Sequence, residues 1–452
     1  MDARIAPEGS LEILSRFEVN RLSDRHEGGL AELWRKCSLA VLNSGNEEDD
    51  VRKIMRMNEN FQISVVRQDR GVALEVRKAP ESAFVNGQMI RGIREHLFAV
   101  LRDLLYVDDE VLSRSRFDLM HSHGITDAVF HILRNARVLQ ADADPRMVVC
   151  WGGHAISRVE YDYSKQVGYA LGLRELDICT GCGAGAMKGP MKGAAVGHAK
   201  QRRREGRYLG LTEPTIIAAE SPNPIVNELV ILPDMEKRLE AFLRVAHAII
   251  VFPGGVGTAE EVLYLLGILL DEANEDVRVP VVFTGPAESA AYFERLNDFV
   301  GATLGLAAQD IYRIIIDAPA QVAEAVLGGV ADVRARRDEA DEPYFFNWRV
   351  NVPLSFQLPF FATHRSMGSL ELHRNQSASS LAVNLRRAFS GIVAGNVRES
   401  GIRLVEERGP FELSGDPEII DALGALLTDF VDQGRMKLSD PDKYVPCYRI
   451  AS

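Results

Sequence analysis

The sequence predicts an α/β protein whose central domain is a doubly wound, Rossmann-like parallel sheet. Seven short apolar runs recur between residues 147 and 316, stretches with helical periodicity fill the intervals, and glycine-rich turns follow several of the runs. Strands that alternate with helices of ten or more residues pair in parallel through crossover connections. Ligands of such sheets bind at the carboxyl ends of the strands, where the glycine-rich turns lie.

The individual elements follow from the spacing of the apolar residues. Short continuous apolar runs predict buried strands, and apolar residues repeated every three to four positions predict helices. Strands are expected at residues 147–151, 176–179, 208–211, 228–232, 248–252, 280–283 and 312–316. Helices are expected at residues 157–171, 186–199, 235–245, 258–270, 287–304 and 320–326.

We expect three domains, with the central one at residues 146–335. Residues 1–145 mix strand-like and helical segments without this alternation, which predicts a separate N-terminal α+β domain. Residues 333–343 form a charge-dense run with few apolar residues, typical of a linker or an exposed helix end. The C-terminal domain is expected at residues 336–452, where residues 343–452 carry extended pieces rich in Phe and Pro and then helical stretches, which predicts an α+β domain.

The composition excludes several classes of protein. The chain has 452 residues, of which 46% are apolar and 26% charged, with a net charge of −12. This balance is typical of a soluble globular protein and argues against a nucleic-acid partner. No apolar run approaches the ~20 residues that span a bilayer, and the N-terminus lacks the apolar core of a signal peptide. We therefore expect no membrane association, a cytoplasmic location and, from five scattered cysteines, no disulfides.

The most informative motif is a glycine-rich turn, Pro-Gly-Gly-Val-Gly-Thr at residues 253–258, between a predicted strand and a predicted helix. Glycines let the backbone approach a ligand closely, and the amino end of a helix offers unpaired N–H groups. A phosphate is the expected guest, with Gly254, Gly255, Gly257 and Thr258 as binding residues. The alternative is an ordinary strand-to-helix turn that Thr258 caps without any ligand.

Two further glycine-rich turns follow other predicted strands. One contains Gly152, Gly153 and His154, and the other spans residues 180–187. Because the carboxyl ends of parallel strands meet at one edge of a sheet, we expect all three turns to line one crevice. The expected binding residues in the second and third turns are Gly152, Gly153, His154, Gly181, Gly183, Gly185 and Met187.

Residues 181–186 also fit the dinucleotide-binding pattern G-x-G-x-x-G/A, with Glu213 as a ribose-binding acid. Glu213 lies about thirty residues beyond the turn, where the pattern expects about twenty. An NAD-dependent oxidoreductase is therefore an alternative function. The sequence contains no Gly-Lys dipeptide, which excludes the nucleotide-triphosphate loop G-x-x-x-x-G-K-[ST].

Charged and polar residues near these turns are candidates for ligand contacts. Arg238 lies one turn into the helix expected at 235–245 and could clamp a phosphate, or it could be a surface residue paired with Asp234. Asn227 and Glu228 could contact a base or ribose, or could cap a strand end. The cysteines at 179 and 182 lack a second pair at zinc-site spacing, so no metal site is expected.

These motifs carry a resemblance to a known family. The turn at 253–258 followed by Ala-Glu-Glu, together with Asp-Met-x-x-Arg at 234–238, is similar to the motifs of the lysine-decarboxylase-like "lonely guy" phosphoribohydrolases. Over nearly its whole length the chain resembles the long bacterial pyrimidine/purine nucleotide 5′-monophosphate nucleosidases, through residues 181–194, 212–214, 222–224 and 387–396. The chain departs from the short members at Glu236 and Leu239, which argues against cytokinin activation. Nothing in the sequence supports amino-acid decarboxylation.

The resemblance implies a hydrolase that splits nucleoside 5′-monophosphates into a free base and ribose 5-phosphate without a metal or redox cofactor. Glu261 matches the motif glutamate and is the expected catalytic carboxylate, with Glu260 as second choice, since neighbouring helical residues cannot face the same way. Arg238 would hold the substrate. The resemblance also implies a homotetramer controlled by the alarmones ppGpp and pppGpp through the flanking domains. A nucleotide-binding sensor without turnover is a further alternative.

Overall fold

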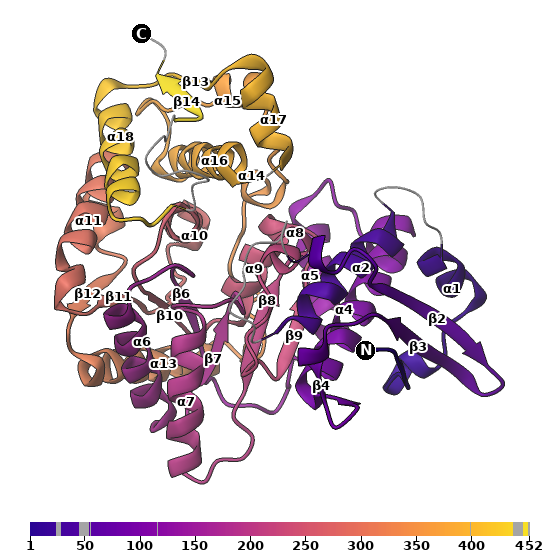
Figure 1. Ribbon diagram of the computed structural model, residues 1–452. Coiled ribbons are helices and arrows are strands. Elements are labelled where there is room, and N and C mark those ends of the chain that lie inside the picture. Colours follow the sequence, from indigo (N-terminus) through magenta and orange to yellow (C-terminus); the bar gives the residue numbers. More distant parts are fainter. Residues whose placement is uncertain are drawn as a thin grey trace. The chain divides into compact units, whose positions relative to one another are not determined.

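The chain forms two compact units in the computed structural model, which describes residues 1–23, 29–44, 54, 56–114, 116–397, 399–436 and 446–450 (Figure 1). The first unit comprises Met1–Gln140, Cys179–Ala184 and Arg207–Ala241. The second comprises Ala141–Ile178, Gly185–Gly206 and Phe242–Ser452. Within the described part of the chain, no helix is long and apolar enough to cross a membrane.

A seven-stranded sheet confirms the predicted doubly wound α/β fold. Its strand order is β12-β11-β10-β6-β7-β8-β9. The strands are β6 (Met147–Trp151), β7 (Asp177–Thr180), β8 (Tyr208–Thr212), β9 (Glu228–Ile231), β10 (Ala248–Val251), β11 (Val281–Gly285) and β12 (Arg313–Ile316). Strand β10 pairs in parallel with β6 and β11, β11 pairs in parallel with β12, and β8 pairs in parallel with β9. The ends of all seven strands lie within two residues of the expected positions.

The strand order locates the point where ligands bind on a sheet of this kind. The first strand of the sheet along the chain is β6. The next strands, β7 to β9, follow on one side of β6, and β10 then pairs with β6 on its other side. The order therefore reverses between β6 and β10, and ligands of doubly wound sheets bind at the carboxyl ends of the strands at this reversal. Both strands belong to the second unit, and each ends in one of the predicted glycine-rich turns.

The second unit also contains most of the helices. They are α6 (Arg158–Gly172), α7 (Lys188–Lys200), α10 (Val256–Leu269), α11 (Ala290–Leu304), α12 (Leu306–Gln309), α13 (Pro319–Glu339), α14 (Leu354–Gln357), α15 (His364–Gly368), α16 (Ala378–Val397), α17 (Glu399–Arg408) and α18 (Pro417–Asp432). A small parallel pair of strands, β13 (Phe411–Leu413) and β14 (Tyr448–Ile450), completes it.

Helices α6 and α7 lie side by side because glycines face each other along their contact (Figure 1). A methyl group at Gly168 would collide with the backbone of Pro190, and one at Gly193 would collide with the backbone of Lys165. Glycine therefore serves close helix packing at these positions. The Gly-Pro-Met-Lys-Gly segment that carries part of the family resemblance includes Gly193, so this part of the motif supports the fold.

The C-terminal residues are built into the same unit as the central strands. Arg244, which is 2% exposed, donates through Nη1 to the carbonyl oxygens of Asn347 at 2.7 Å and Val350 at 2.6 Å. His247 accepts the backbone N–H of Met147 through Nδ1 at 3.0 Å and contacts the Tyr344 carbonyl through Nε2 at 2.8 Å. A buried network thus joins the segment after α13 to the start of β6.

Helix α13 continues well beyond the residues expected to end it. It runs to Glu339 because Val330, Val333 and Arg337 extend its buried stripe, and Arg337 donates to the Tyr344 carbonyl at 2.7 Å. The charge-dense run at 333–343 is thus mainly the exposed side of a helix end. The expected boundary between residues 335 and 336 falls inside this helix.

The first unit combines the N-terminal residues with β8 and β9. Its helices and antiparallel strands are α1 (Arg16–Ser23), α2 (Leu30–Leu42), α4 (Arg91–Tyr106), α5 (Ser122–Asn135), α8 (Pro214–Ala219), β1 (Ala3–Ile5), β2 (Gln62–Gln68), β3 (Gly71–Arg77), β4 (Phe84–Val85) and β5 (Gln88–Met89). The carboxylate of Asp103 on α4 accepts the N–H of Ile231 at 2.8 Å, and Arg102 donates to the Leu229 carbonyl at 2.8 Å. These bonds satisfy backbone groups on β9, the last strand of the sheet, and fasten α4 to it.

Candidate active site

The predicted glycine-rich turns of the second unit meet at the carboxyl ends of β6 and β10. The N–H of Gly153 donates to the Pro253 carbonyl at 3.0 Å, and the N–H of Ala186 donates to the Gly153 carbonyl at 2.9 Å. The turn after β6 therefore bonds to the other two. The predicted binding residues of this unit all lie in these turns or within a few positions of the two hydrogen bonds. They are Gly152, Gly153, His154, Gly185, Met187, Gly254, Gly255, Gly257 and Thr258.

The glycines of these turns have different physical roles. Gly185 has a φ of +59°, and a methyl group there would collide with the His154 carbonyl. A methyl group at Gly254 would collide with the Thr258 hydroxyl and lie 2.7 Å from the Gly153 nitrogen. Gly257, in contrast, has open space around the position of a methyl group. The fold thus requires glycine at 185 and 254, and it does not require glycine at 257.

Helix α10 starts at the 253–258 turn and is buried almost all round. It packs against α16, where a methyl group at Gly267 would collide with the Phe356 ring and lie 2.7 Å from Ala382. Glu260 points into this contact and forms an ion pair with Arg386 of α16, with 3.1 Å between carboxylate and guanidinium. Both side chains are almost completely buried. Glu261, the next residue, is partly exposed.

A short segment after α18 lies on the same turn. Gly434, with a φ of +64°, ends α18, and the N–H of Arg435 then donates to the Phe430 carbonyl at 2.7 Å. This cap directs the Arg435 backbone onto the turn, where a methyl group at Gly255 would collide with the Arg435 carbonyl oxygen. Gly255 is therefore glycine for a steric reason that has no connection to a ligand.

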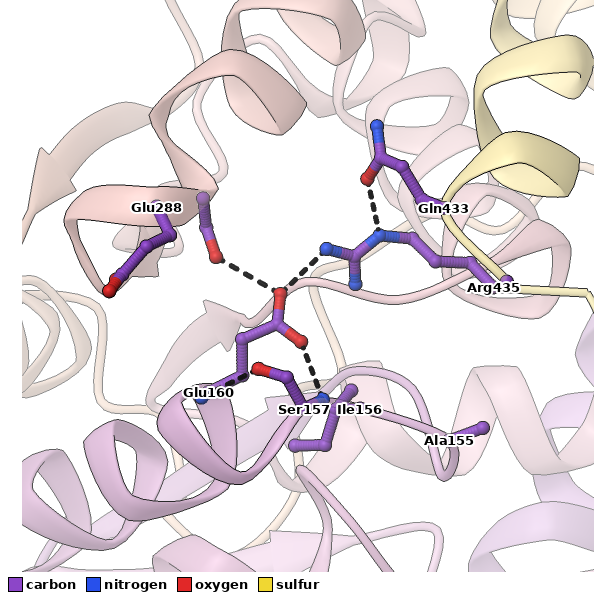
Figure 2. Close-up of a pocket in the computed structure, with 9 residues that line it drawn as sticks. Ala155, Ile156, Ser157, Glu160, Glu288, Gln433 and Arg435 are labelled. Carbon is purple, nitrogen blue, oxygen red and sulfur yellow. Dashed lines mark hydrogen bonds and ion pairs between the residues drawn. The ribbon is translucent and has the colours of Figure 1, made fainter.

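The Arg435 side chain lines a pocket of about 490 Å³ with the amino end of α6 (Figure 2). Its Nη2 contacts Glu160 at 2.6 Å, and its guanidinium lies 4.7 Å from the centre of the Tyr292 ring. Tyr292 in turn accepts the N–H of Gly254 at 3.2 Å. The other residues of the lining are Ala155, Ile156, Ser157, Glu288, Ser289, Gln433 and Gly434.

Hydrogen bonds and charge set the protonation states around this pocket. Burial alone would raise the pKa of Glu160, but bonds from Arg435, from the Ser157 N–H and from the Ser289 hydroxyl lower it. Burial raises the pKa of Tyr292 to about 12. At neutral pH Glu160 in the pocket is therefore ionised, and Tyr292 beside Arg435 is neutral.

In the first unit, Arg238 is a buried residue of α9 (Met235–Val245). It is 5% exposed, its Nε donates to the Leu211 carbonyl at 3.0 Å, and its Nη1 lies 3.3 Å from the Met235 sulfur. The alternative of a surface arginine paired with Asp234 is wrong, because Lys237 takes that carboxylate at 2.7 Å. Arg238 is instead fixed at the end of β8.

The turn at 181–183 in the same unit is held by an asparagine. Asn223 donates through Nδ2 to the carbonyl oxygens of Cys182 at 3.0 Å and Gly183 at 3.2 Å. Cys182 has a φ of +62°, which is unusual for a residue with a side chain. Burial raises its pKa to about 12, although the charge of Arg238 acts in the opposite direction. The Cys182 thiol is therefore protonated at neutral pH.

Three other candidates of the first unit have local partners. Asn227 accepts the N–H of Tyr208 at 2.8 Å, and Glu228 pairs with Arg207 at 2.7 Å. Both lie at the amino end of β9, whereas Arg238 follows its carboxyl end. Glu213 caps α8 by accepting the N–H groups of two residues in its first turn at 2.9 and 3.0 Å. In the dinucleotide-binding interpretation Glu213 binds a ribose, but here its carboxylate already accepts hydrogen bonds from the helix.

Sequence reasoning missed Arg435, Glu160, Tyr292 and Arg386. Only Glu160 has a local signal, because Ser157 and Glu160 match the S-x-x-E capping box and form it in the structure. Arg435 contacts Glu160 across a separation of 275 residues, and Arg386 contacts Glu260 across 126. No local pattern of residues indicates such pairs.

The doubly wound sheet, with its glycine-rich turns at the strand reversal and a carboxylate just inside α10, defines a Rossmann-like α/β protein of the lysine-decarboxylase-like class. The family model described as possible lysine decarboxylase matches residues 187–326. The model of pyrimidine/purine nucleotide 5′-monophosphate nucleosidases matches residues 3–111, and the model of the C-terminal part of these nucleosidases matches residues 330–451.

Individual relatives agree with these matches. The chain is 53% identical over 455 residues to the pyrimidine/purine nucleotide 5′-monophosphate nucleosidase of Escherichia coli strain K12, with all of both chains covered. It is 27% identical over 132 residues to a probable cytokinin riboside 5′-monophosphate phosphoribohydrolase of Oryza sativa subsp. japonica, covering 29% of this chain and 51% of that one. The chain therefore belongs to the pyrimidine/purine nucleotide 5′-monophosphate nucleosidase family, a family of hydrolytic enzymes. The family predicted from the motifs is confirmed.

Proposed function

We propose that this enzyme hydrolyses the N-glycosidic bond of purine and pyrimidine nucleoside 5′-monophosphates, releasing the free base and ribose 5-phosphate. The observation that carries the proposal is the amino end of α10. There a glycine-rich turn offers backbone N–H groups at the strand reversal, and a carboxylate follows one turn into the helix. Such an end binds a phosphate, and the carboxylate can act on the sugar that the phosphate carries.

Glu261 is the carboxylate we assign to the reaction. Its neighbour Glu260 faces α16, is buried, and is neutralised by Arg386 at 3.1 Å. A carboxylate in that position is screened from a ligand by the helix itself. Glu261 is turned about 100° from Glu260 around the helix axis and is partly exposed. These differences support Glu261 as the catalytic residue and Glu260 as a residue that positions α10.

The chemistry follows from the bond that breaks. As the bond between C1′ of the ribose and the base nitrogen lengthens, positive charge develops on the sugar. A nearby carboxylate stabilises that charge and orients a water molecule toward C1′. The water oxygen bonds to C1′, one water proton is released to the carboxylate, and the base leaves with the bond electrons as it gains a proton. The sugar product is ribose 5-phosphate.

The remaining candidates receive supporting roles in this proposal. Gly257 and Thr258 would offer their N–H groups to the 5′-phosphate, and the turn after β6 would close one side of the site. Arg238 stays the residue predicted to hold the 5′-phosphate or the ribose hydroxyls. Asn227 and Glu228 stay predicted base or ribose contacts.

We also propose that the residues flanking the central domain serve control and assembly. The support is the resemblance over the whole chain to long family members that are controlled by guanosine alarmones and form tetramers. Titrating the enzyme with ppGpp while base release is measured tests the control, and light scattering tests the assembly. A cytoplasmic location of the enzyme and activity without a cofactor also remain predictions.

The decisive experiment incubates the purified protein with each nucleoside monophosphate and measures free base by chromatography. Base release supports the proposal. Binding without release would favour a sensor, and binding of NAD without release would favour an oxidoreductase. Glu261→Gln should lower kcat by about 100-fold with nearly unchanged KM, because it removes a group used mainly in the transition state. Full activity of this variant would exclude Glu261 from the mechanism.

A further inference from the structure

We propose that Arg435 is a substrate-binding residue whose guanidinium moves from Glu160 to the 5′-phosphate of the bound nucleotide. This inference rests on the proposed function, because it assumes a phosphorylated ligand at the amino end of α10. It adds a binding residue from the far C-terminal part of the chain, which no sequence motif of the site includes.

The position of the Arg435 backbone is the first observation. Its carbonyl oxygen packs directly on Gly255, and its Cβ lies 3.7 Å from the position of a methyl group on that glycine. The cap at Gly434 fixes this backbone. The side chain of Arg435 therefore starts beside the turn that would hold the phosphate, and rotation about side-chain bonds suffices to change where its guanidinium points.

The surroundings of the guanidinium are the second observation. It lies over the Tyr292 ring at 4.7 Å, and the Tyr292 hydroxyl contacts the Gly254 nitrogen of the turn at 3.2 Å. Its Nε donates to Gln433 at 2.7 Å and its Nη2 to Glu160 at 2.6 Å. Figure 2 shows the group at the wall of the pocket, with no bond drawn to the third nitrogen, Nη1. Within the described part of the chain, Nη1 has no hydrogen-bond partner.

Glu160 keeps other hydrogen-bond donors when Arg435 turns away. Its carboxylate also accepts the Ser157 N–H at 2.9 Å and the Ser289 hydroxyl at 3.0 Å, and it lies in the first turn of α6, where the helix dipole favours negative charge. These bonds remain when Arg435 turns away. The carboxylate therefore stays hydrogen-bonded without the guanidinium.

The charges favour the exchange. Residues 253–258 contain no cationic side chain, so the turn by itself offers a phosphate only backbone N–H groups and a hydroxyl. Glu160 and Glu288 both line the neighbouring pocket and would repel a phosphate. A phosphate dianion attracts a guanidinium more strongly than a single carboxylate does, and arginine can bind it with two parallel hydrogen bonds. Transfer of Arg435 thus places a positive charge between the phosphate and these carboxylates.

The test compares KM and kcat for a nucleoside monophosphate in Arg435→Gln and Glu160→Gln of the full chain. Both changes remove the ion pair, but they have opposite consequences for a phosphate. Arg435→Gln should raise KM about 10- to 100-fold with kcat within about threefold. Glu160→Gln should leave KM unchanged or lower it, because it frees the guanidinium. Arg435→Lys should recover part of the affinity.

Arg295→Gln is the matched control. Arg295 pairs with Asp429 of α18 at 2.6 Å, so this change also removes an arginine that tethers α18, away from the pocket. It should leave KM unchanged. An equal rise of KM in Arg435→Gln and Glu160→Gln, or no rise in Arg435→Gln, would overturn the proposal and leave the ion pair as a structural contact only.

Calorimetry with ribose 5-phosphate separates this inference from the proposed function. If no monophosphate releases a base, the proposed function fails, but weaker binding of ribose 5-phosphate to Arg435→Gln than to the unaltered protein would still support the phosphate contact. Equal binding to both proteins would refute it.

Discussion

Gly257→Ala separates the glycines that the fold requires from one that the fold does not require. In the free protein a methyl group at Gly257 meets nothing within 4 Å, and the residue lies in the first turn of α10. Alanine is preferred over glycine inside a helix by roughly 0.5–1 kcal/mol. We therefore expect this variant to be at least as stable as the unaltered protein, with a thermal midpoint unchanged or about 1–2 °C higher.

The same methyl group would stand where we place the phosphate. If it prevents one backbone N–H from bonding a phosphate oxygen, the loss is about 1.5–3 kcal/mol, the usual range for a hydrogen bond to a charged group. This corresponds to a decrease of about 10- to 100-fold in kcat/KM for a nucleoside monophosphate. The expected combination is full stability with weakened substrate binding.

Gly255→Ala is the contrasting variant. Its methyl group would collide with the Arg435 carbonyl oxygen, so the segment after α18 must move. We expect a loss of stability of about 1–3 kcal/mol, typical of overpacking, together with weaker binding. The assays are thermal unfolding and base release over a range of substrate concentrations. A Gly257→Ala enzyme with unchanged KM would refute the placement of the phosphate at the amino end of α10.

Two further predictions concern the buried carboxylates. Glu260→Gln removes the carboxylate that neutralises Arg386 in the contact between α10 and α16, and urea unfolding should show a loss of about 3 kcal/mol. The loss in Glu261→Gln should be smaller, because that side chain is partly exposed. Glu160 has a pKa below its ordinary value of 4.5, so its contribution to stability is fully present above about pH 4.5 and is lost as the pH falls through the lowered pKa. The thermal midpoints of the unaltered protein and Glu160→Gln should therefore differ at pH 7 and converge in acid, and a constant difference would show that ionised Glu160 contributes nothing.

The extent of the sheet was predictable because its signals are local. A buried parallel strand is a continuous apolar run, and a helix repeats its apolar residues with its own period, so a short window of sequence contains the information. The end of α13 was missed for a related reason. Its buried stripe continues through Val330 and Val333, but the many charged residues around them resemble a linker.

The position of the candidate site could be derived from the sequence in part. The turn after β10 could be identified, since glycines between a strand and a helix allow close backbone approach to an anion. The individual glycines could not be distinguished, because Gly254 and Gly255 are required by neighbours from other parts of the fold and Gly257 is not. The glycine pattern in the sequence looks the same whether or not the fold requires a particular glycine.

By itself, then, the sequence determined the strands, the fold class and the family, because apolar periodicity, strand-to-helix turns and motif residues lie within a few positions of one another. Only the tertiary structure decided which glutamate of α10 is paired in the core and which arginine packs on the turn. Arg386 forms an ion pair with Glu260 in the core, and Arg435 packs on Gly255 beside the proposed phosphate site. Both contacts join residues more than a hundred positions apart, and packing brings such residues together with no trace in the local sequence.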